Sequence, residues 1–143
     1  MEDAGRRSPN TLSGGQKQRI AMAGVLVMAP EIIIFDEATA MLDPVGREEV
    51  LTYLKRLHSL GKTIIMITHY VEEAICADRV FVMKDGQILK SGAPDEILTD
   101  ASLLRKAHLM PPVAVQIYYD LLESGIVLKK CPLTKDQKSY VPH

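Results

Sequence analysis

Two adjacent carboxylates, Asp36 and Glu37, are the residues of this sequence best suited to chemistry. They follow a short apolar, β-branched run, residues 31–35, which predicts a central strand of a parallel sheet covered on both faces. Open α/β sheets bind ligands beyond the carboxyl ends of their strands, and successive residues there point to opposite sides. The Asp36 carboxylate is therefore suited to binding Mg²⁺, which prefers oxygen ligands. The Glu37 carboxylate is suited to polarising a water molecule. The alternative is that the pair merely opens a solvated loop.

A second candidate for chemistry lies at the start of a helix predicted over residues 14–28. Ser13 fits the N-cap, and Gln16 completes a capping-box pattern. The free N–H groups and positive dipole end of such a helix make an anion site, and Gly14 and Gly15 would let a phosphate approach closely. An ordinary capping box with flexible residues is the alternative. The apolar residues from position 20 onward predict that the rest of this helix is buried.

The next elements place a histidine beside the carboxylates. Asp43 is an N-cap followed by Pro44, and Gly61 is a natural C′ residue, which predicts a helix over about residues 44–59. A second apolar strand over 63–68 then pairs in parallel with the first through a right-handed crossover. His69 directly follows that strand. A histidine in this position is otherwise most often a turn residue.

The remaining sequence predicts small elements. A short helix over about 70–77 is followed by a hairpin with strands 79–83 and 88–90. Two further short helices are expected over 95–98 and 102–106. An amphipathic helix is expected over 112–124, with apolar positions at Val113, Ile117, Leu121 and Leu122.

Composition limits the class of protein. The 143 residues are 47% hydrophobic and carry 17 basic and 18 acidic side chains. With a pI near 6.4, the chain has no overall field that would attract nucleic acid, so no nucleic-acid partner is expected. Cys76 and Cys131 lie far apart without metal-ligand spacing, which favours reduced thiols over a zinc site. The longest apolar run is too short to cross a bilayer.

Several of these segments, taken in order, resemble the motifs of ABC transporter ATPases. They are the signature motif Leu12-Ser13-Gly14-Gly15-Gln16, the Walker B pair Asp36-Glu37, the D-loop Ala40-Met41-Leu42-Asp43 and the switch histidine His69. The D-loop departs from the usual Ser-Ala-Leu-Asp because Ala40 has no hydroxyl group. Asp43 also has a structural explanation as the cap of its helix.

This resemblance implies an α/β fold: a partial P-loop NTPase core with a mostly parallel sheet and a short helical C-terminal extension. It implies ATP and Mg²⁺ as cofactors, with Asp36 at the metal and Glu37 and His69 in catalysis. The signature residues 13–16 would contact nucleotide held by the opposite subunit, and Asp43 would be a further nucleotide-binding residue. The implied domains are a linker over 1–11, the ATPase portion over 12–110 and the extension over 111–143.

Residues 8–110 resemble most closely the ATPases of energy-coupling-factor transporters, through Glu37-Ala38-Thr39 and Met41-Leu42-Asp43-Pro44. The resemblance implies a second ATPase subunit, identical or different, a membrane coupling subunit and a substrate-binding membrane subunit. It implies a peripheral protein at the cytoplasmic face of the cell membrane. The transported substrate does not follow from this sequence.

A P-loop is not found within these 143 residues. Gly61-Lys62-Thr63 mimics the end of that motif, but Arg56 stands where its first glycine belongs, and the tripeptide leads into a strand rather than a helix. We therefore expect the chain alone to be nearly inactive, because phosphate positioning is the main source of phosphoryl-transfer catalysis. Two alternatives remain: a non-enzymatic partner that lends its signature helix to an intact ATPase, and a truncated product without function.

Overall fold

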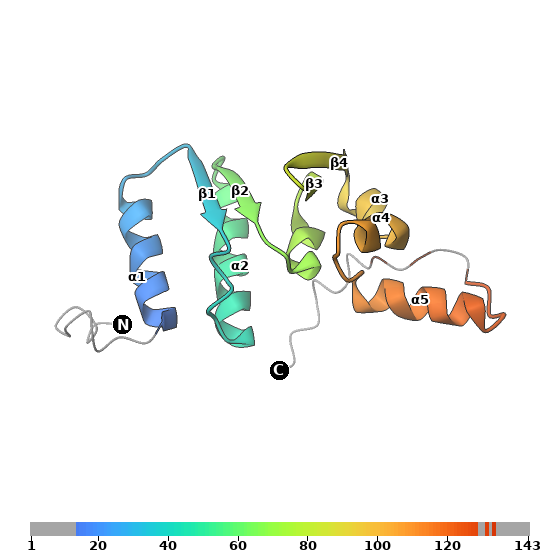
Figure 1. Ribbon diagram of the computed structural model, residues 1–143. Coiled ribbons are helices and arrows are strands. Elements are labelled where there is room, and N and C mark those ends of the chain that lie inside the picture. Colours follow the sequence, from blue (N-terminus) through green and yellow to red (C-terminus); the bar gives the residue numbers. More distant parts are fainter. Residues whose placement is uncertain (1–13, 129–130, 132, 134–143) are drawn as a thin grey trace. The chain divides into compact units, whose positions relative to one another are not determined.

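The chain divides into two compact units between Thr68 and His69. The computed structural model describes residues 14–128, 131 and 133. Figure 1 shows small helices and short strands in both units. The predicted linker over residues 1–11, and Leu12 and Ser13 of the predicted signature motif, lie outside the described residues. The domain boundary predicted after residue 110 stays a prediction.

Unit 1 is a helix followed by a β–α–β segment. Its elements are α1 (Gly14–Val27), β1 (Ile32–Asp36), α2 (Pro44–Ser59) and β2 (Thr63–Ile67). β1 and β2 form a parallel two-stranded sheet in the register Ile32↔Thr63 to Asp36↔Ile67. The helix–strand–helix–strand order and the parallel pairing are as the sequence predicts.

Local chemistry sets both ends of α2. Gly46 N donates to Asp43 Oδ1 over 3.1 Å, so Asp43 is the N-cap, and Pro44 occupies the first turn. At the other end Gly61 has φ +85°, and its N–H donates to His58 O over 2.8 Å. A left-handed residue after a helix satisfies terminal carbonyls, and glycine adopts this conformation at little cost.

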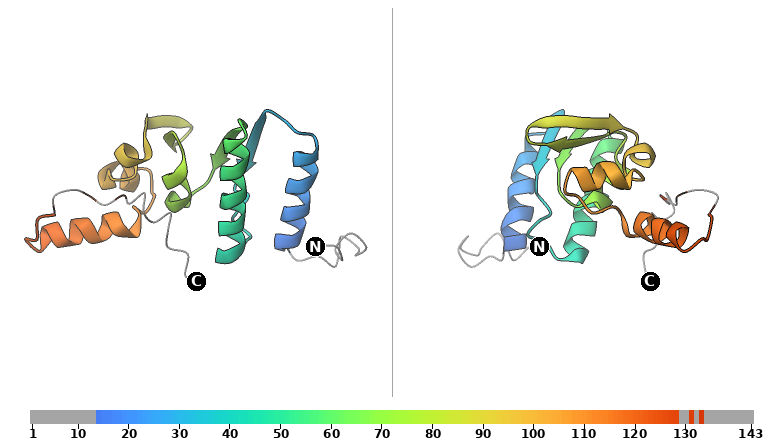
Figure 2. Two further views of the ribbon diagram at one scale, coloured as in Figure 1. Left: turned by 180° about the vertical axis from the view of Figure 1, so that it is seen from behind. Right: turned by 45° about the vertical axis from the view of Figure 1, so that its right-hand side comes forward.

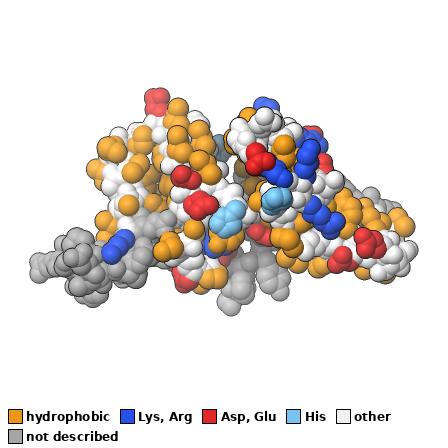
Figure 3. All heavy atoms as spheres, in the orientation of Figure 1, with side chains coloured by type: hydrophobic (Ala, Val, Ile, Leu, Met, Phe, Trp, Pro, Cys, Tyr) orange, Lys and Arg blue, Asp and Glu red, His pale blue; other side chains and the backbone are white. Residues whose placement is uncertain are grey.

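One face of the β1–β2 sheet is covered and the other is open. Ile33 and Phe35 are buried in a cluster with Leu42, Val50 and Leu54, and α2 lies along the sheet in the views of Figures 1 and 2. The opposite side chains are exposed apolar residues: Ile32, Ile34, Ile65 and Ile67. Figure 3 shows hydrophobic side chains gathered on the surface of unit 1. The predicted burial of both faces is therefore wrong for the described chain.

The predicted burial of the second half of α1 is also wrong here. Val27 and Met28 are 85% and 72% exposed, and Ile20 and Val25 are more than two-fifths exposed. From this helix, Met22 and Leu26 pack against the cluster of unit 1. An apolar sequence on nearly every face predicts burial correctly only when other elements surround the helix.

The described part of unit 2 contains a hairpin and four short helices. Its elements are η3 (Val71–Cys76, a 3₁₀ helix), β3 (Val80–Lys84), β4 (Gln87–Gly92), α3 (Pro94–Ile97), α4 (Ala101–Lys106) and α5 (Val113–Glu123). β3 and β4 are antiparallel, and Asp85 and Gly86 in the turn have φ +50° and +74°. Two left-handed residues in a two-residue turn match the twist of a hairpin. Each predicted element of this unit is present within two residues of its expected ends.

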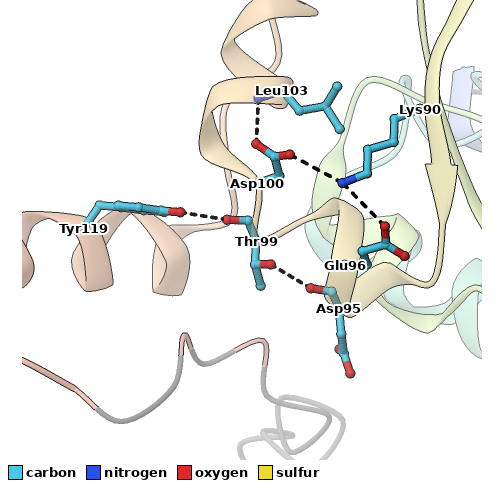
Figure 4. Close-up of polar contacts among 7 residues, drawn as sticks. All are labelled: Lys90, Asp95, Glu96, Thr99, Asp100, Leu103 and Tyr119. Atoms are coloured by element: carbon cyan, nitrogen blue, oxygen red, sulfur yellow. Dashed lines mark hydrogen bonds and ion pairs between the residues drawn. The ribbon is translucent and has the colours of Figure 1, made fainter.

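The core of unit 2 is more completely enclosed. Ile97, Leu104 and Val115 have no exposed surface, and Leu98 is 1% exposed. Polar contacts surround this core: Tyr119 donates to Thr99 O over 3.1 Å, and Asp100 accepts from Leu103 N over 2.9 Å (Figure 4).

The face that α5 buries differs from the predicted one. Val113 and Ile117 are 62% and 52% exposed, whereas Val115 is fully buried. Apolar periodicity identified the helix correctly, but the contact is made by a residue outside the predicted stripe.

No helix in the described part of the chain has the length and apolar character that crossing a bilayer requires.

Candidate functional site

The candidate site is built on the carboxyl end of β1. Asp36 is the last strand residue and pairs in register with Ile67 of β2. Glu37 extends this pairing by one bond, since its N–H donates to Ile67 O over 2.9 Å. Both carboxylate side chains are exposed. The alternation of the strand places Asp36 on the open face, opposite Phe35.

Glu37 adopts a backbone conformation that non-glycine residues avoid. Its φ is +45°, in the left-handed region, where an L residue pays about 1–2 kcal/mol. Residues held in such conformations cluster at functional sites, because the surrounding structure must over-determine them. Here the Glu37 N–H bond to Ile67 O and the Ala40 N–H bond to Glu37 O, 3.0 Å long, hold the turn from both sides.

The loop from Glu37 to Asp43 is anchored at its middle and its end. Thr39 is 2% exposed, and Leu42, whose N–H donates to Thr39 O over 3.1 Å, is packed into the core of unit 1. Asp43 then caps α2. Its carboxylate thus has the structural role predicted for it. The buried Thr39 was not among the predicted site residues, although the Glu37-Ala38-Thr39 segment carried part of the family resemblance.

The acidic end of β1 is compatible with Mg²⁺ bound together with phosphates. Among the described residues no group of three or more histidine, cysteine and acidic side chains could hold a metal by itself. Mg²⁺ in nucleotide sites is typically bound by one or two carboxylates with phosphate oxygens and water completing the shell. A single exposed carboxylate such as Asp36 fits that donor set, and an all-protein metal cage does not.

The predicted anion site at the start of α1 is partly described. The helix begins at Gly14 and continues through Gly15 and Gln16, and the Gln16 side chain is exposed. This start agrees with the predicted one. Ser13, the predicted cap, lies outside the described residues.

His69 is the first residue of unit 2 and follows β2 by two positions. Its side chain is exposed, and its ring lies against the Tyr70 ring, with centroids 4.2 Å apart and planes inclined by 36°. It also lines a hollow that lies within unit 2. Asp36, Glu37 and Asp43 thus belong to one unit and His69 to the other.

Comparisons with known proteins identify the kind of sequence that forms this site. A family model described as ABC transporter matches residues 1–40. The energy-coupling factor transporter ATP-binding protein EcfA1 of Clostridium novyi is 49% identical over 138 residues, which are 96% of this chain and 49% of that protein. The chain is thus similar to ABC transporter ATPases along nearly its whole length. Its similarity to proteins named as energy-coupling-factor ATPases confirms the subtype indicated by the sequence.

Solved structures of ABC transporter ATPases share the fold. The cbiO1 protein of Clostridium perfringens, described as part of the ABC transporter complex cbiONQ, is 41% identical with a TM-score of 0.58, over 76% of this chain and 44% of that one. An ATP-binding cassette in a dimeric post-hydrolysis state with ADP and Pi is 37% identical with a TM-score of 0.59, over 62% and 38%. The predicted fold class, a partial P-loop NTPase core, is confirmed.

The chain spans about half the length of the curated relatives it matches. Within that span, the strand-end carboxylates, the loop to Asp43 and the helix starting at Gly14 occupy the elements where the sequence motifs predicted them. The roles of the individual residues stay predictions.

Proposed function

We propose that this chain forms part of a composite ATP site in the ATP-binding subunit of an energy-coupling-factor-type importer. Asp36, Glu37 and His69 would serve one nucleotide. Residues 13–16 and Asp43 would face nucleotide held by a second ATPase subunit. The similarity to named energy-coupling-factor ATPases supports this class of function.

One observation carries the proposal: Glu37 leaves β1 in a left-handed conformation, tied by its N–H to Ile67 O. A strained acidic residue at the carboxyl end of a parallel strand is placed where α/β sheets bind their ligands. A glycine at position 37 would adopt this backbone conformation without strain, but the residue there is a glutamate.

The two carboxylates are proposed to have different roles in the reaction. Bound Mg²⁺ neutralises phosphate charge, and the Asp36 carboxylate would be one of its oxygen ligands, directly or through water. Glu37 would accept a hydrogen bond from the attacking water and orient it toward the γ-phosphate. His69 would donate to that phosphate, as imidazole can near neutral pH. Asp43 would keep α2 capped while the D-loop faces the second subunit.

The proposed partners are a second ATPase subunit, a membrane coupling subunit and a substrate-binding membrane subunit. A related cassette has been described as a dimer with ADP and Pi, and cbiO1 as part of a transporter complex. By analogy we place this chain at the cytoplasmic face of the membrane, as a peripheral subunit.

Substitution of Glu37 tests the proposal. We expect the purified chain to release no phosphate from Mg-ATP, because its 143 residues contain no P-loop motif. Mixing it with a polypeptide that supplies a P-loop should restore turnover, measured as phosphate release. In that mixture Glu37→Gln should lower kcat by roughly 100-fold or more, the usual contribution of a catalytic base.

Glu31→Gln is the matched control, because Glu31 precedes β1 at its other end and is also an exposed glutamate. It should leave kcat unchanged. If the mixture turns over ATP and Glu37→Gln leaves the rate unaltered, the chain is a non-enzymatic partner that lends only its signature helix. Robust turnover by the chain alone would contradict the composite site.

A further inference from the structure

A hollow of about 320 Å³ within unit 2 is lined by His69 and by residues of the segment around the start of α5. One wall consists of His69, Tyr70, Val71 and Glu72, at the start of η3. The other wall, which we call the 108–116 wall, comes from the segment between α4 and α5 and from the first turns of α5. Its lining residues are His108, Leu109, Met110, Pro111 and Gln116.

Both walls are anchored in the same hydrophobic core. Val71, two residues after His69, is 8% exposed and belongs to the cluster that contains Ile97 and Leu104. Leu109 of the opposite wall packs against that cluster. Since protein interiors are close-packed, a displacement of one wall changes the room available to the other.

The 108–116 wall is held by its own hydrogen bonds. Gln116 Nε2 donates to Pro111 O over 2.6 Å and so ties α5 to the chain that precedes it. Pro111 itself is buried. Further along α5, Val115 is fully buried, and the hydroxyl of Tyr119 donates to Thr99 O. This part of the wall therefore has a defined position.

His108 fixes the other end of the wall. Its φ is +60°, where glycine would be easier to place, and the Leu109 N–H donates to Leu104 O over 2.9 Å as in a helix-ending turn. Lys84 Nζ lies 3.1 Å from His108 Nε2 and 2.9 Å from Lys106 O. An ammonium group can only donate, so Nε2 of His108 is the acceptor in this contact.

We propose that the 108–116 wall positions the side chain of His69, with Gln116 as the principal positioning residue. The paired rings of His69 and Tyr70 line the hollow opposite this wall, so the wall sets how much room the imidazole has. A change in the hydrogen bond between Gln116 and Pro111 would alter that space and hence the orientation of the His69 imidazole. The consequence for ATP turnover rests on the proposed function of His69, but the positioning itself does not.

The positioning is tested by NMR on the full chain, through the imidazole Cε1–Hε1 signal of His69. Gln116→Ala should shift this signal, as should Gln116→Glu, which keeps the volume but removes the donor to Pro111 O. Ile117→Ala is the control, because Ile117 is the next residue on α5, is 52% exposed and does not line the hollow. It should leave the His69 signal in place.

The methyl signals of Ile97, which is fully buried in the core of unit 2, report whether each variant remains folded. An unmoved His69 signal in both Gln116 variants, with the Ile97 signals also unmoved, would overturn the proposal. So would an equal shift in Ile117→Ala.

Kinetics separate this inference from the proposed function. In the mixture that hydrolyses ATP, Gln116→Ala should lower kcat by several-fold with little change in KM, since His69 is proposed to act on bound nucleotide. If the NMR shift occurs but even the unaltered mixture has no turnover, the positioning stands and the proposed function fails. If turnover is normal and kcat is unchanged in a variant whose His69 signal does not move, the positioning fails alone.

Discussion

Unit 1 and unit 2 differ in how completely they bury the apolar side chains of their cores. In unit 2 short helices and a hairpin enclose a core in which Ile97, Leu104 and Val115 have no exposed surface. In unit 1 a parallel strand pair is covered on one face, while Ile34 and Ile65 on the other are 63% and 45% exposed. Parallel sheets normally bury both faces. In the unit that carries Asp36 and Glu37, one face of the parallel strand pair is thus left open.

The largest expected effect concerns stability within each unit. Ile97→Ala should destabilise unit 2 by about 2–5 kcal/mol, because it creates a cavity in a fully enclosed site. Ile34→Ala, the same substitution on the open face of unit 1, should change stability by less than about 0.5 kcal/mol. Native-state hydrogen exchange measures the two units separately. Equal losses at both positions would show that the open face of unit 1 is covered in solution.

A smaller effect is expected at the helix caps, where the two units are alike. Asp43 caps α2 in unit 1, and Asp100 caps α4 in unit 2 by accepting from Leu103 N. Alanine at either position should cost about 1 kcal/mol, measured by urea unfolding, and asparagine should retain most of the stability. Lys90 Nζ lies 3.6 Å from Asp100 Oδ2, but a pair this exposed adds little.

Only one of these caps is proposed to matter for ATP turnover. Asp43→Asn should therefore reduce phosphate release in the reconstituted mixture although α2 remains capped, whereas Asp100→Asn should not. Equal rates of phosphate release for the two asparagine variants would show that Asp43 has only a structural role.

The smallest effect concerns the two thiols of unit 2. Burial raises the pKa of the Cys131 thiol, whereas Cys76 is exposed. Since the thiolate is the reactive form, a raised pKa leaves less of it at neutral pH. Timed alkylation with iodoacetamide, followed by mass spectrometry, should show Cys131 reacting more slowly, with a rate that rises toward alkaline pH. Faster alkylation of Cys131 than of Cys76 at pH 7 would contradict the burial.

Much of the fold was predictable because its signals are local. Asp43 with Pro44, and Gly61 at φ +85°, set the two ends of α2 through bonds between near neighbours in the chain. The same holds for the hairpin turn at Asp85 and Gly86. The order of strand, helix and strand also predicted the parallel pairing, which places Asp36 opposite Ile67.

The candidate site was predictable in its residues but not in its backbone. Asp36 and Glu37 stand at the expected strand end, yet nothing in their types indicated that Glu37 would turn into the left-handed region. That conformation depends on a bond to Ile67 O, thirty residues later in the chain. The hollow beside His69 was likewise not predicted, because its walls come from residues about forty positions apart.

The sequence by itself determined the secondary structure, the helix caps and the family, because these depend on neighbouring residues and on motif spacing. Tertiary structure decided which apolar faces are covered. Val115 is buried while Val113 and Ile117 are exposed, and one face of β1 is open although residues 32–35 are all apolar. The physical reason is that burial depends on the elements that surround a residue, and periodicity describes only the element to which it belongs.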